Sequence, residues 1–261
     1  MIMTSNEFGT PGREYWFSIR AKNKKLTLNW SNVELLKKYV AKQSGAHIWK
    51  TGLNYQINAA FFFWLQWVHD DRFNAIVNSI DNLDSIQKVL DIGSGASIFD
   101  LCLHQLLPKA QFTLLDKDTD TNFDEGKFVQ YDDRYHHYNN WNIVNDAIVT
   151  SKLAQENFRF ISPEVDHWGE LDMVVSFWSW CWHYPKEVYW DKVMQNLKPG
   201  GHLILDVLYR KDKDIIEEIS DAMNCKPIAL KKHPTIKGHP WQDSQVDIDG
   251  FYGGLYKWVR K

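Results

Sequence analysis

The sequence predicts an α/β fold in which helices cover both faces of a mostly parallel sheet. From residue 88 onward, short apolar runs of strand length alternate with segments of helix length, an alternation typical of doubly wound sheets. Before residue 80, apolar residues instead recur at three-to-four spacing, which favours helices. The change of pattern near residue 80 divides the chain into two parts.

The first part, residues 1–80, is expected to form a helical cap that closes over the functional site. After an irregular start, residues 32–42 and 58–80 have helical spacing, and the pair Ser44 and Gly45 favours a break between them. The apolar run at 59–68 has about half the length of the roughly 20 residues that a membrane-spanning helix needs. It therefore predicts a buried helix and no membrane span.

The second part, residues 81–261, is expected to be one domain built on a sheet. Apolar β-rich runs predict five strands, and a hairpin-like end follows around 252–259. The five strands are expected at 89–92, 112–115, 158–161, 173–177 and 203–207.

Composition excludes several classes of function. A net charge of −3 supplies no global field for nucleic acid or an anionic membrane. The cysteines Cys102, Cys181 and Cys225 are odd in number and widely spaced, so they predict neither a disulfide framework nor a zinc site. Because the start of the sequence also lacks the pattern of a secretory signal, a cytoplasmic location is expected.

The first candidate binding element is the turn after the strand at 89–92. The strand carries Asp91 near its end and turns through Gly93 and Gly95 into a helix. Glycines let a ligand approach the backbone, and a helix start offers free N–H groups. A dinucleotide fingerprint would need a third glycine where Ile98 stands. An acid at this strand tip instead suits a ligand with a cationic group, because a carboxylate would repel a phosphate.

A second acid follows the next strand. Asp116 stands 21 residues after Gly95 and directly after the strand at 112–115. From this position a carboxylate can accept hydrogen bonds from both hydroxyls of a ribose. The two acids together predict a cationic ligand that contains a ribose.

On these residues the chain resembles the class I S-adenosylmethionine-dependent methyltransferases. Their first motif is a strand that ends in Asp-x-Gly-x-Gly-x-Gly, and their second strand ends in an acid. Residues 171–176 resemble the fourth strand of that family, and residues 197–205 resemble its turn into the fifth. The pieces lie in the family's order between residues 88 and 207, with one departure, because Ser97 replaces the third glycine.

The resemblance implies a Rossmann-like, seven-stranded mixed sheet with an antiparallel last strand, and S-adenosyl-L-methionine as cofactor. By position, Ser162 and Glu164 after the third strand and Phe177 near the fourth are expected near the adenine. The expected cofactor-binding residues are Asp91, Gly93, Ser94, Gly95, Asp116, Lys117, Ser162, Ser176 and Phe177.

Acceptor groups are expected at the tip of the fourth strand, because the acceptor binds there in the family that the chain resembles. His183 is the candidate general base, since an imidazole titrates near neutrality and can take a hydroxyl proton; a histidine that only hydrogen-bonds a loop carbonyl is the alternative. Trp180 and Tyr184 are expected to wall the acceptor site, although tryptophans in this segment could equally pack in the core. Cys181 is expected to be a buried thiol and not a nucleophile.

The long insert at 119–157 is a second candidate for acceptor binding. Its mixture of hydroxyl, amide and ring side chains suits a sugar or nucleotide, and His137 and Tyr138 are the expected contacts. His136 and His137 with the acids Asp132 and Asp133 could suggest a metal, but adjacent side chains on a helix point about 100° apart. No metal is therefore predicted.

The predicted function is methyl transfer to a small molecule, with a hydroxyl of a sugar or of a nucleotide-linked or phosphorylated metabolite as the leading acceptor. A non-catalytic S-adenosylmethionine-binding module is one alternative. A Mg²⁺-dependent phosphatase with an aspartate nucleophile is another, because the acids of residues 116–120 resemble its first motif.

Overall fold

The computed structural model describes eleven segments of the 261-residue chain, and the statements that follow concern them. They are 15–32, 35–36, 72–117, 130–131, 135–136, 140–165, 167–177, 179–181, 184–207, 213–234 and 251–261.

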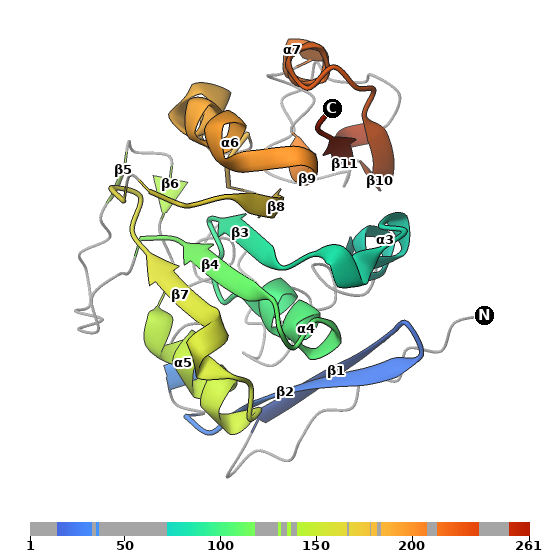
Figure 1. The fold of residues 1–261 in the computed structure, drawn as a ribbon. Coiled ribbons are helices and arrows are strands. Elements are labelled where there is room, and N and C mark those ends of the chain that lie inside the picture. The colour runs from blue at the N-terminus through green and yellow to red at the C-terminus, as the bar shows by residue number, and fades with distance from the viewer. Residues whose placement is uncertain are drawn as a thin grey trace.

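A seven-stranded sheet forms the centre of the structure (Figure 1), with the order β10-β11-β9-β8-β3-β4-β7. In this sheet β11 runs antiparallel to both of its neighbours, β10 and β9, and all the other strands run in one common direction. The predicted seven-stranded mixed sheet with an antiparallel last strand is therefore confirmed. The strands are β3 (Lys88–Ile92), β4 (Gln111–Leu115), β7 (Phe158–Ile161), β8 (Leu171–Ser176), β9 (Leu197–Val207), β10 (Ile228–Pro234) and β11 (Phe251–Val259).

Helices cover both faces of the sheet, as Figure 1 shows. Apolar side chains of α3, α4 and α5 form one core with one face of the strands, and those of α6 and α7 form a second core with the other face. This double covering explains why the parallel strands are apolar on both sides. The helices are α3 (Arg72–Ser79), α4 (Ile98–Leu106), α5 (Trp141–Thr150), α6 (Trp190–Asn196) and α7 (Lys213–Ala222).

The start of the chain differs from the irregular segment expected there. Residues 15–30 form an antiparallel hairpin of β1 (Tyr15–Ala21) and β2 (Lys24–Trp30). Its two turn residues, Lys22 and Asn23, have φ values of 46° and 62°, and two-residue turns with positive φ match the twist of paired strands. Alternating apolar residues on both sides of this turn were the signal in the sequence.

The hairpin packs against α4 and α5, and Figure 1 shows it along the outer side of these helices. Phe17 of the hairpin, Phe73 of α3 and Val89 of β3 belong to one hydrophobic core, so the described residues on the two sides of residue 80 pack together. Helix α3 confirms the end of the helix expected at 58–80, and the remainder of that helix lies outside the described residues. Of the helix expected at 32–42, residues 35 and 36 are described and helical.

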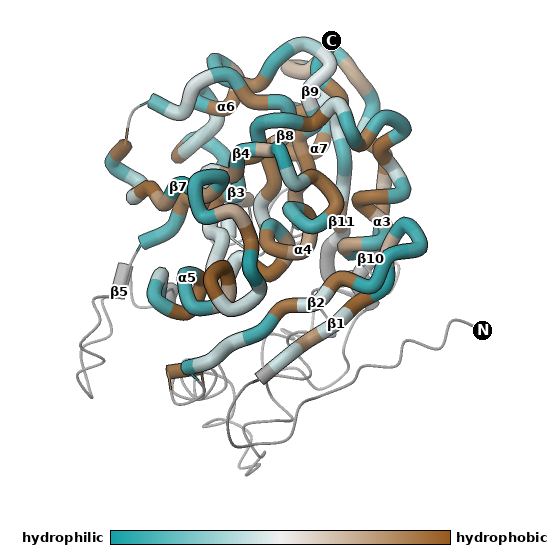
Figure 2. The backbone as a smooth tube through the Cα atoms, turned by 60° about the horizontal axis from the view of Figure 1, so that its bottom comes forward, coloured by the Kyte–Doolittle hydropathy of each residue, from teal (hydrophilic) through white to brown (hydrophobic). Residues whose placement is uncertain are grey.

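Helix α4 is enclosed on all sides because the sheet covers one side and the hairpin the other. Figure 2 shows α4 near the centre of the molecule, with most of its residues in the colour of hydrophobic side chains. Eight of its nine residues are buried, Asp100 and His104 among them. A helix in such a position is expected to carry apolar residues on every face, and the buried polar residues Asp100 and His104 are exceptions to this pattern.

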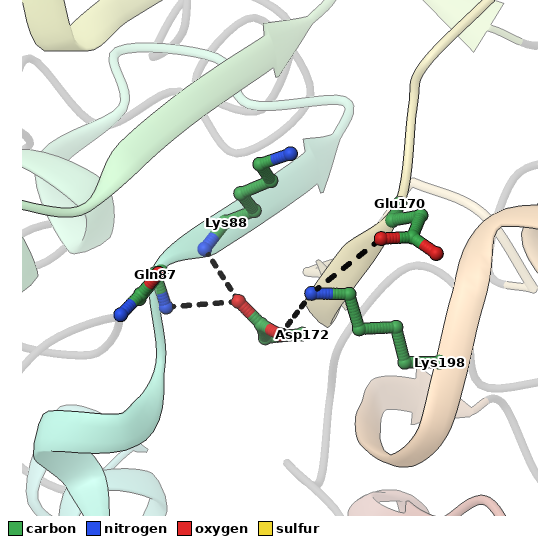
Figure 3. A network of polar contacts seen from close by, with 5 residues as sticks. All are labelled: Gln87, Lys88, Glu170, Asp172 and Lys198. Carbon is green, nitrogen blue, oxygen red and sulfur yellow. Dashed lines mark hydrogen bonds and ion pairs between the residues drawn. The ribbon is translucent and has the colours of Figure 1, made fainter.

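The amino ends of three strands are joined by polar contacts (Figure 3). One oxygen of Asp172 in β8 accepts hydrogen bonds from the backbone N–H groups of Gln87 and Lys88, each at 2.9 Å. The other oxygen pairs with the ammonium of Lys198 in β9 at 3.1 Å. Lys198 also lies 3.9 Å from the carboxylate of Glu170. These contacts fix the register of β3, β8 and β9 at the edge opposite to the site.

Shorter elements complete the chain, and a buried ion pair of 3.3 Å joins Arg72 of α3 to Asp206 of β9. Among the described residues, we find no helix that combines the length and the hydropathy needed to cross a bilayer. The short elements are β5 (Gln130–Tyr131), β6 (Tyr135–His136) and the 3₁₀ turns Leu83–Ser85, Gln155–Asn157 and Lys186–Val188.

Candidate functional site

The carboxyl ends of the parallel strands bring the predicted cofactor-binding residues to one edge of the sheet. Strands β3, β4, β7 and β8 are adjacent and parallel, so the segments that follow them leave the sheet at the same edge. In open α/β sheets, ligands bind outside this edge. The turn after β3 is the centre of the candidate site.

This turn follows a left-handed backbone path at three positions. Gly93, Gly95 and Ser97 have φ values of 75°, 52° and 51°. The N–H of Gly93 donates to the carbonyl of Leu115 at 2.7 Å and holds the turn against β4. Glycine adopts this conformation freely, whereas Ser97 does so at a cost of roughly 1–2 kcal/mol. The serine that departs from the family pattern therefore occupies the backbone conformation that glycine would take.

The segment after β8 approaches the same turn closely. A Cβ atom at Gly93 would lie 2.0 Å from the hydroxyl of Ser179 and 2.2 Å from its Cβ. Because one of these atoms is fixed to the backbone, a side-chain rotation cannot relieve the contact. Only glycine fits at position 93 in this arrangement.

Asp116 connects the ends of β3 and β4. One of its carboxylate oxygens accepts from the N–H of Gly95 at 2.7 Å, and the other accepts from the N–H of Lys117 at 2.7 Å. Each carboxylate oxygen has two lone pairs and can accept more than one hydrogen bond. The acid expected to bind a ribose thus lies directly against the glycine turn.

Asp91 is buried and faces a second acid, Asp100, on α4. The side-chain environment raises the pKa of Asp91 well above its usual range, first through burial and then through the nearby carboxyl groups of Asp100 and Asp116. Burial also raises the pKa of Asp100 to about 7. The sequence analysis missed Asp100, although an acid inside an otherwise apolar helix directly after the glycine turn was a signal that could have found it.

The residues expected near the adenine lie beside one another after β4 and β7. A hydrogen bond from Ser162 lowers the pKa of Glu164, and the positive charge of Lys117 lowers it further. Ser162, Glu164 and Lys117 therefore form a polar group next to Asp116. The roles of Ser162 and Glu164 at an adenine stay predictions.

Ser176 and Phe177 hold the segment after β8. The buried hydroxyl of Ser176 donates to the carbonyl of Ile92 at 2.7 Å and accepts from the N–H of Trp180 at 3.0 Å. It therefore links the end of β3 to the segment after β8. The ring of Phe177 packs edge-on against Phe99 of α4, with 5.0 Å between ring centroids.

Trp180, expected to wall the acceptor site, lies in the core. It is 0% exposed, and its indole N–H donates to the carbonyl of Lys186 at 2.9 Å. Its ring packs edge-on against Tyr189. Trp180 therefore packs in the core, which was the alternative to a role in the acceptor site. The aromatic residues Tyr189 and Trp190 enclose it.

Other acceptor residues are placed only in part. Tyr184 is half-buried, and its backbone closes a turn in which its carbonyl accepts from the N–H of Cys181 at 2.9 Å. Cys181 is buried, as expected, and forms no disulfide with another described cysteine. His183, His137 and Tyr138 lie outside the described residues.

The described residues contain no group of three or more His, Cys, Asp or Glu side chains that could hold a metal ion. Of the acids on which the phosphatase alternative depends, only Asp116 is described; Asp118 and Asp120 lie outside the described residues.

Similar proteins are found by structure and not by sequence. No family model and no curated protein matches the chain. Among solved structures, a precorrin-6y C5,15-methyltransferase from Geobacter metallireducens is 16% identical, with a TM-score of 0.43 over 74% of this chain and 90% of that one.

Two further solved structures are similar. The SAM-dependent methyltransferase from Agrobacterium tumefaciens is 14% identical, with a TM-score of 0.45 over 75% of this chain and 62% of that one. An N,N-8-amino-8-demethyl-D-riboflavin dimethyltransferase from Streptomyces davawensis is 11% identical, with a TM-score of 0.44 over 78% and 56%. The strand order and the single antiparallel strand of this chain are those of the class I, Rossmann-like methyltransferase fold.

Proposed function

We propose that this chain is an S-adenosylmethionine-dependent methyltransferase that acts on a small-molecule acceptor. The observation that carries the proposal is the 2.7 Å contact between the Asp116 carboxylate and the N–H of Gly95. This contact places an acid suited to ribose hydroxyls against a left-handed glycine turn, beside the buried acid Asp91.

The charge of the site supports a cationic ligand over a dinucleotide. Asp91, Asp100 and Asp116 lie together at the turn, and the first two are buried. A pyrophosphate at this turn would meet three carboxyl groups, whereas a ligand with an ammonium and a sulfonium group would be attracted to them. The donor and acceptor set of the turn therefore fits S-adenosylmethionine.

Each part of the cofactor has a candidate partner in the site. Asp116 accepts from the ribose hydroxyls, Asp91 faces the amino group, and Ser162 and Glu164 lie on the adenine side. When bound, the cofactor supplies an electrophilic methyl group on a positively charged sulfur. The chain's part is to align that group with an acceptor and to exclude water, which together supply most of the acceleration of such a displacement.

A hydroxyl acceptor, on a sugar or a nucleotide-linked metabolite, is the finer proposal. It depends on His183 as the base that takes the hydroxyl proton. Its sequence neighbours Cys181 and Tyr184 form a closed turn at the tip of β8, next to the glycine turn. His137 and Tyr138 of the insert are the proposed further acceptor contacts.

Calorimetric titration tests the cofactor proposal. Wild type is expected to bind S-adenosylmethionine and S-adenosylhomocysteine, and Asp116→Ala is expected to bind both at least tenfold more weakly, since hydrogen bonds to a charged group contribute about 1.5–3 kcal/mol. Asp221→Ala, which removes an exposed acid on α7, is the matched control. Equal affinity in the two variants would remove the ribose assignment.

Turnover distinguishes the enzyme from its alternatives. Pooled metabolites and nucleotide sugars are incubated with the protein and S-adenosylmethionine, and mass spectrometry follows the gain of one methyl mass together with S-adenosylhomocysteine. His183→Ala should lose most turnover and keep cofactor affinity. Cofactor binding without any methylated product would favour the non-catalytic module, and Mg²⁺-dependent phosphate release would favour the phosphatase.

A further inference from the structure

Two acids lie against each other between the sheet and α4. Asp91 of β3 is 2% exposed and Asp100 of α4 is 0% exposed. A hydrogen bond between the two carboxyl groups is among the causes that raise the pKa of Asp91. Two buried carboxyl groups that share a hydrogen bond cannot both be ionised without a compensating positive charge.

Apart from each other, and from the backbone N–H of Asp100 that acts to lower the pKa of its own carboxyl, the oxygens of this pair lack partners among the described residues. Neither oxygen of Asp100 nor Oδ1 of Asp91 makes a hydrogen bond of normal geometry to a nitrogen or hydroxyl donor of the described chain. The buried hydroxyls of Ser94 and Ser97, on the same turn, are also unpartnered. Ser97 precedes α4 at the N-cap position, but its side chain makes no capping hydrogen bond. Ser97 and Asp100 therefore do not form the capping box for which a serine and an acid at this spacing are often used.

An unpartnered buried polar atom costs roughly 1–3 kcal/mol, and four residues carry such atoms within ten positions of the sequence. A fold that served only stability would gain from apolar residues here. The buried, unpartnered hydroxyl of Ser97 is independent of the acids and indicates the same location. The cluster is therefore prepared for a ligand that donates hydrogen bonds and carries positive charge.

We propose that Asp91 and Asp100 form a proton-sharing acid pair that binds the cationic amino group of the cofactor, and that this binding expels one proton from the pair. The inference rests on the proposed function and adds Asp100 to the site. Before binding, the pair holds two protons in acid and one at higher pH. On binding, a pair with two protons releases one to solvent and keeps one, so that a single negative charge faces the ammonium group.

The other groups around the pair determine where this coupling occurs. Asp116, after β4, raises the pKa of Asp91, and the thiol of Cys102 on α4 lies within electrostatic reach of Asp100. Among the described residues, no basic side chain contributes to the pKa of either acid. Because burial raises the pKa of Asp100 to about 7, proton release should be nearly complete near pH 6 and below half near pH 7.5.

Calorimetry with the intact chain measures this release directly. S-adenosylhomocysteine is titrated near pH 6 and near pH 7.5, each in two buffers that differ in ionisation enthalpy, and the difference in heat gives the number of protons released. The matched ligand is 5′-methylthioadenosine, which has the same nucleoside and thioether but lacks the amino-acid part and with it the cationic α-amino group. Release of about one proton near pH 6 is expected with the first ligand and none with the second.

Two variants test the role of Asp100. Asp100→Asn replaces the acid with an amide that donates to Asp91, so proton release at pH 7 should fall from about half a proton to near zero. Its affinity for S-adenosylhomocysteine should fall about tenfold, with affinity for 5′-methylthioadenosine retained. Asp172→Asn, at the opposite edge of the sheet, should release protons as wild type does. Circular dichroism checks that each variant is folded.

The outcomes distinguish this inference from the proposed function. If neither ligand binds to wild type, the proposed function fails. If both ligands bind to wild type and release equal numbers of protons, the inference fails and the proposed function stands. This comparison uses the wild-type protein alone, so it does not depend on the folding of a variant. Unchanged proton release at pH 7 in folded Asp100→Asn would likewise overturn it.

Discussion

The two edges of the central sheet carry acids in opposite situations. At the amino edge, Asp172 accepts from two backbone N–H groups and pairs with Lys198 (Figure 3). At the carboxyl edge, Asp91 and Asp100 are more deeply buried, and among the described residues three of their oxygens have no donor beyond the facing carboxyl group. Strand β3 carries Asp91, which lacks such partners, and strand β8 carries Asp172, which has them.

This difference teaches how to separate structural acids from binding acids. Asp172 stabilises the register of the strands because every oxygen has a partner. Asp91 and Asp100 contribute no such stabilisation, because burial opposes their ionisation and no basic side chain in the described part of the chain offsets it. A pair like this is retained at a cost in stability, which supports a role in binding.

The largest expected effect compares glycines at the two edges. Gly93 and Gly200 both have left-handed φ values, 75° and 79°, but a Cβ would collide with Ser179 at the first and meet nothing within 4 Å at the second. Gly93→Ala should lower the free energy of unfolding by about 3–5 kcal/mol through strain and overpacking. Gly200→Ala should lower it by only about 1–2 kcal/mol. Urea unfolding measures both, and equal losses would show that the contact at Gly93 relaxes freely.

The next effect is the pH dependence of stability that Asp100 confers. Its pKa in the folded chain is about 7 against a usual 3.8, so the folded state binds its proton more tightly than the unfolded state. The contribution is therefore present in acid and is lost as pH rises from about 4 to 7. Relative to Asp100→Asn, wild type should lose about 2–3 kcal/mol between pH 5 and pH 8, at 1.36 kcal/mol per pKa unit.

Unfolding curves of both proteins at pH 5 and pH 8 measure this difference. A constant gap between them would mean that Asp100 does not titrate in this range. Asp172→Asn serves as the comparison from the amino edge, where the acid is held by backbone N–H groups and a lysine.

A smaller effect is expected from removal of the partnered acid. Asp172→Ala leaves the N–H groups of Gln87 and Lys88 without their acceptor. Because the site is partly exposed, water replaces some of the lost bonds, and the free energy of unfolding should fall by about 1–2 kcal/mol. Affinity for S-adenosylhomocysteine should stay at the wild-type value. A binding defect as large as that of Asp100→Asn would contradict the division between the two edges.

The smallest effect concerns the exposed end of the amino-edge network. Lys198 is 37% exposed at the side chain and pairs with Asp172 and with the 78% exposed Glu170. Lys198→Ala should lower the free energy of unfolding by no more than about 1 kcal/mol, and Glu170→Ala by a few tenths. Both losses should shrink in high salt. A loss at Lys198 above that of Asp172→Ala would make the lysine, and not the acid, the centre of the network.

Much of the site followed from local sequence signals. Gly93 and Gly95 were predicted at a tight turn, and both have positive φ. The strands at 89–92 and 112–115 were predicted from apolar runs, and β3 and β4 contain them. Strand β10 was not predicted, because the polar residues of this outermost strand lack the continuous apolar run of the central ones.

Other features depended on what packs against a residue. Ser176 and Trp180 stand at the strand tip where ligands bind, yet the hydroxyl of Ser176 joins two segments and the ring of Trp180 fills the core. No local pattern separates these uses, because serine and tryptophan suit both. The assignments of His183, His137 and Tyr138 remain predictions.

The sequence by itself determined the alternation of strands and helices between residues 88 and 207 and the left-handed turn with its acids, because backbone preference and apolar periodicity act over a few neighbouring residues. Only the tertiary structure decided that Asp100 faces Asp91, since this requires α4 to lie between the sheet and the N-terminal hairpin. Burial and electrostatic environment are properties of surroundings assembled from distant parts of the chain. They turn an acid on a helix into one half of a candidate binding pair.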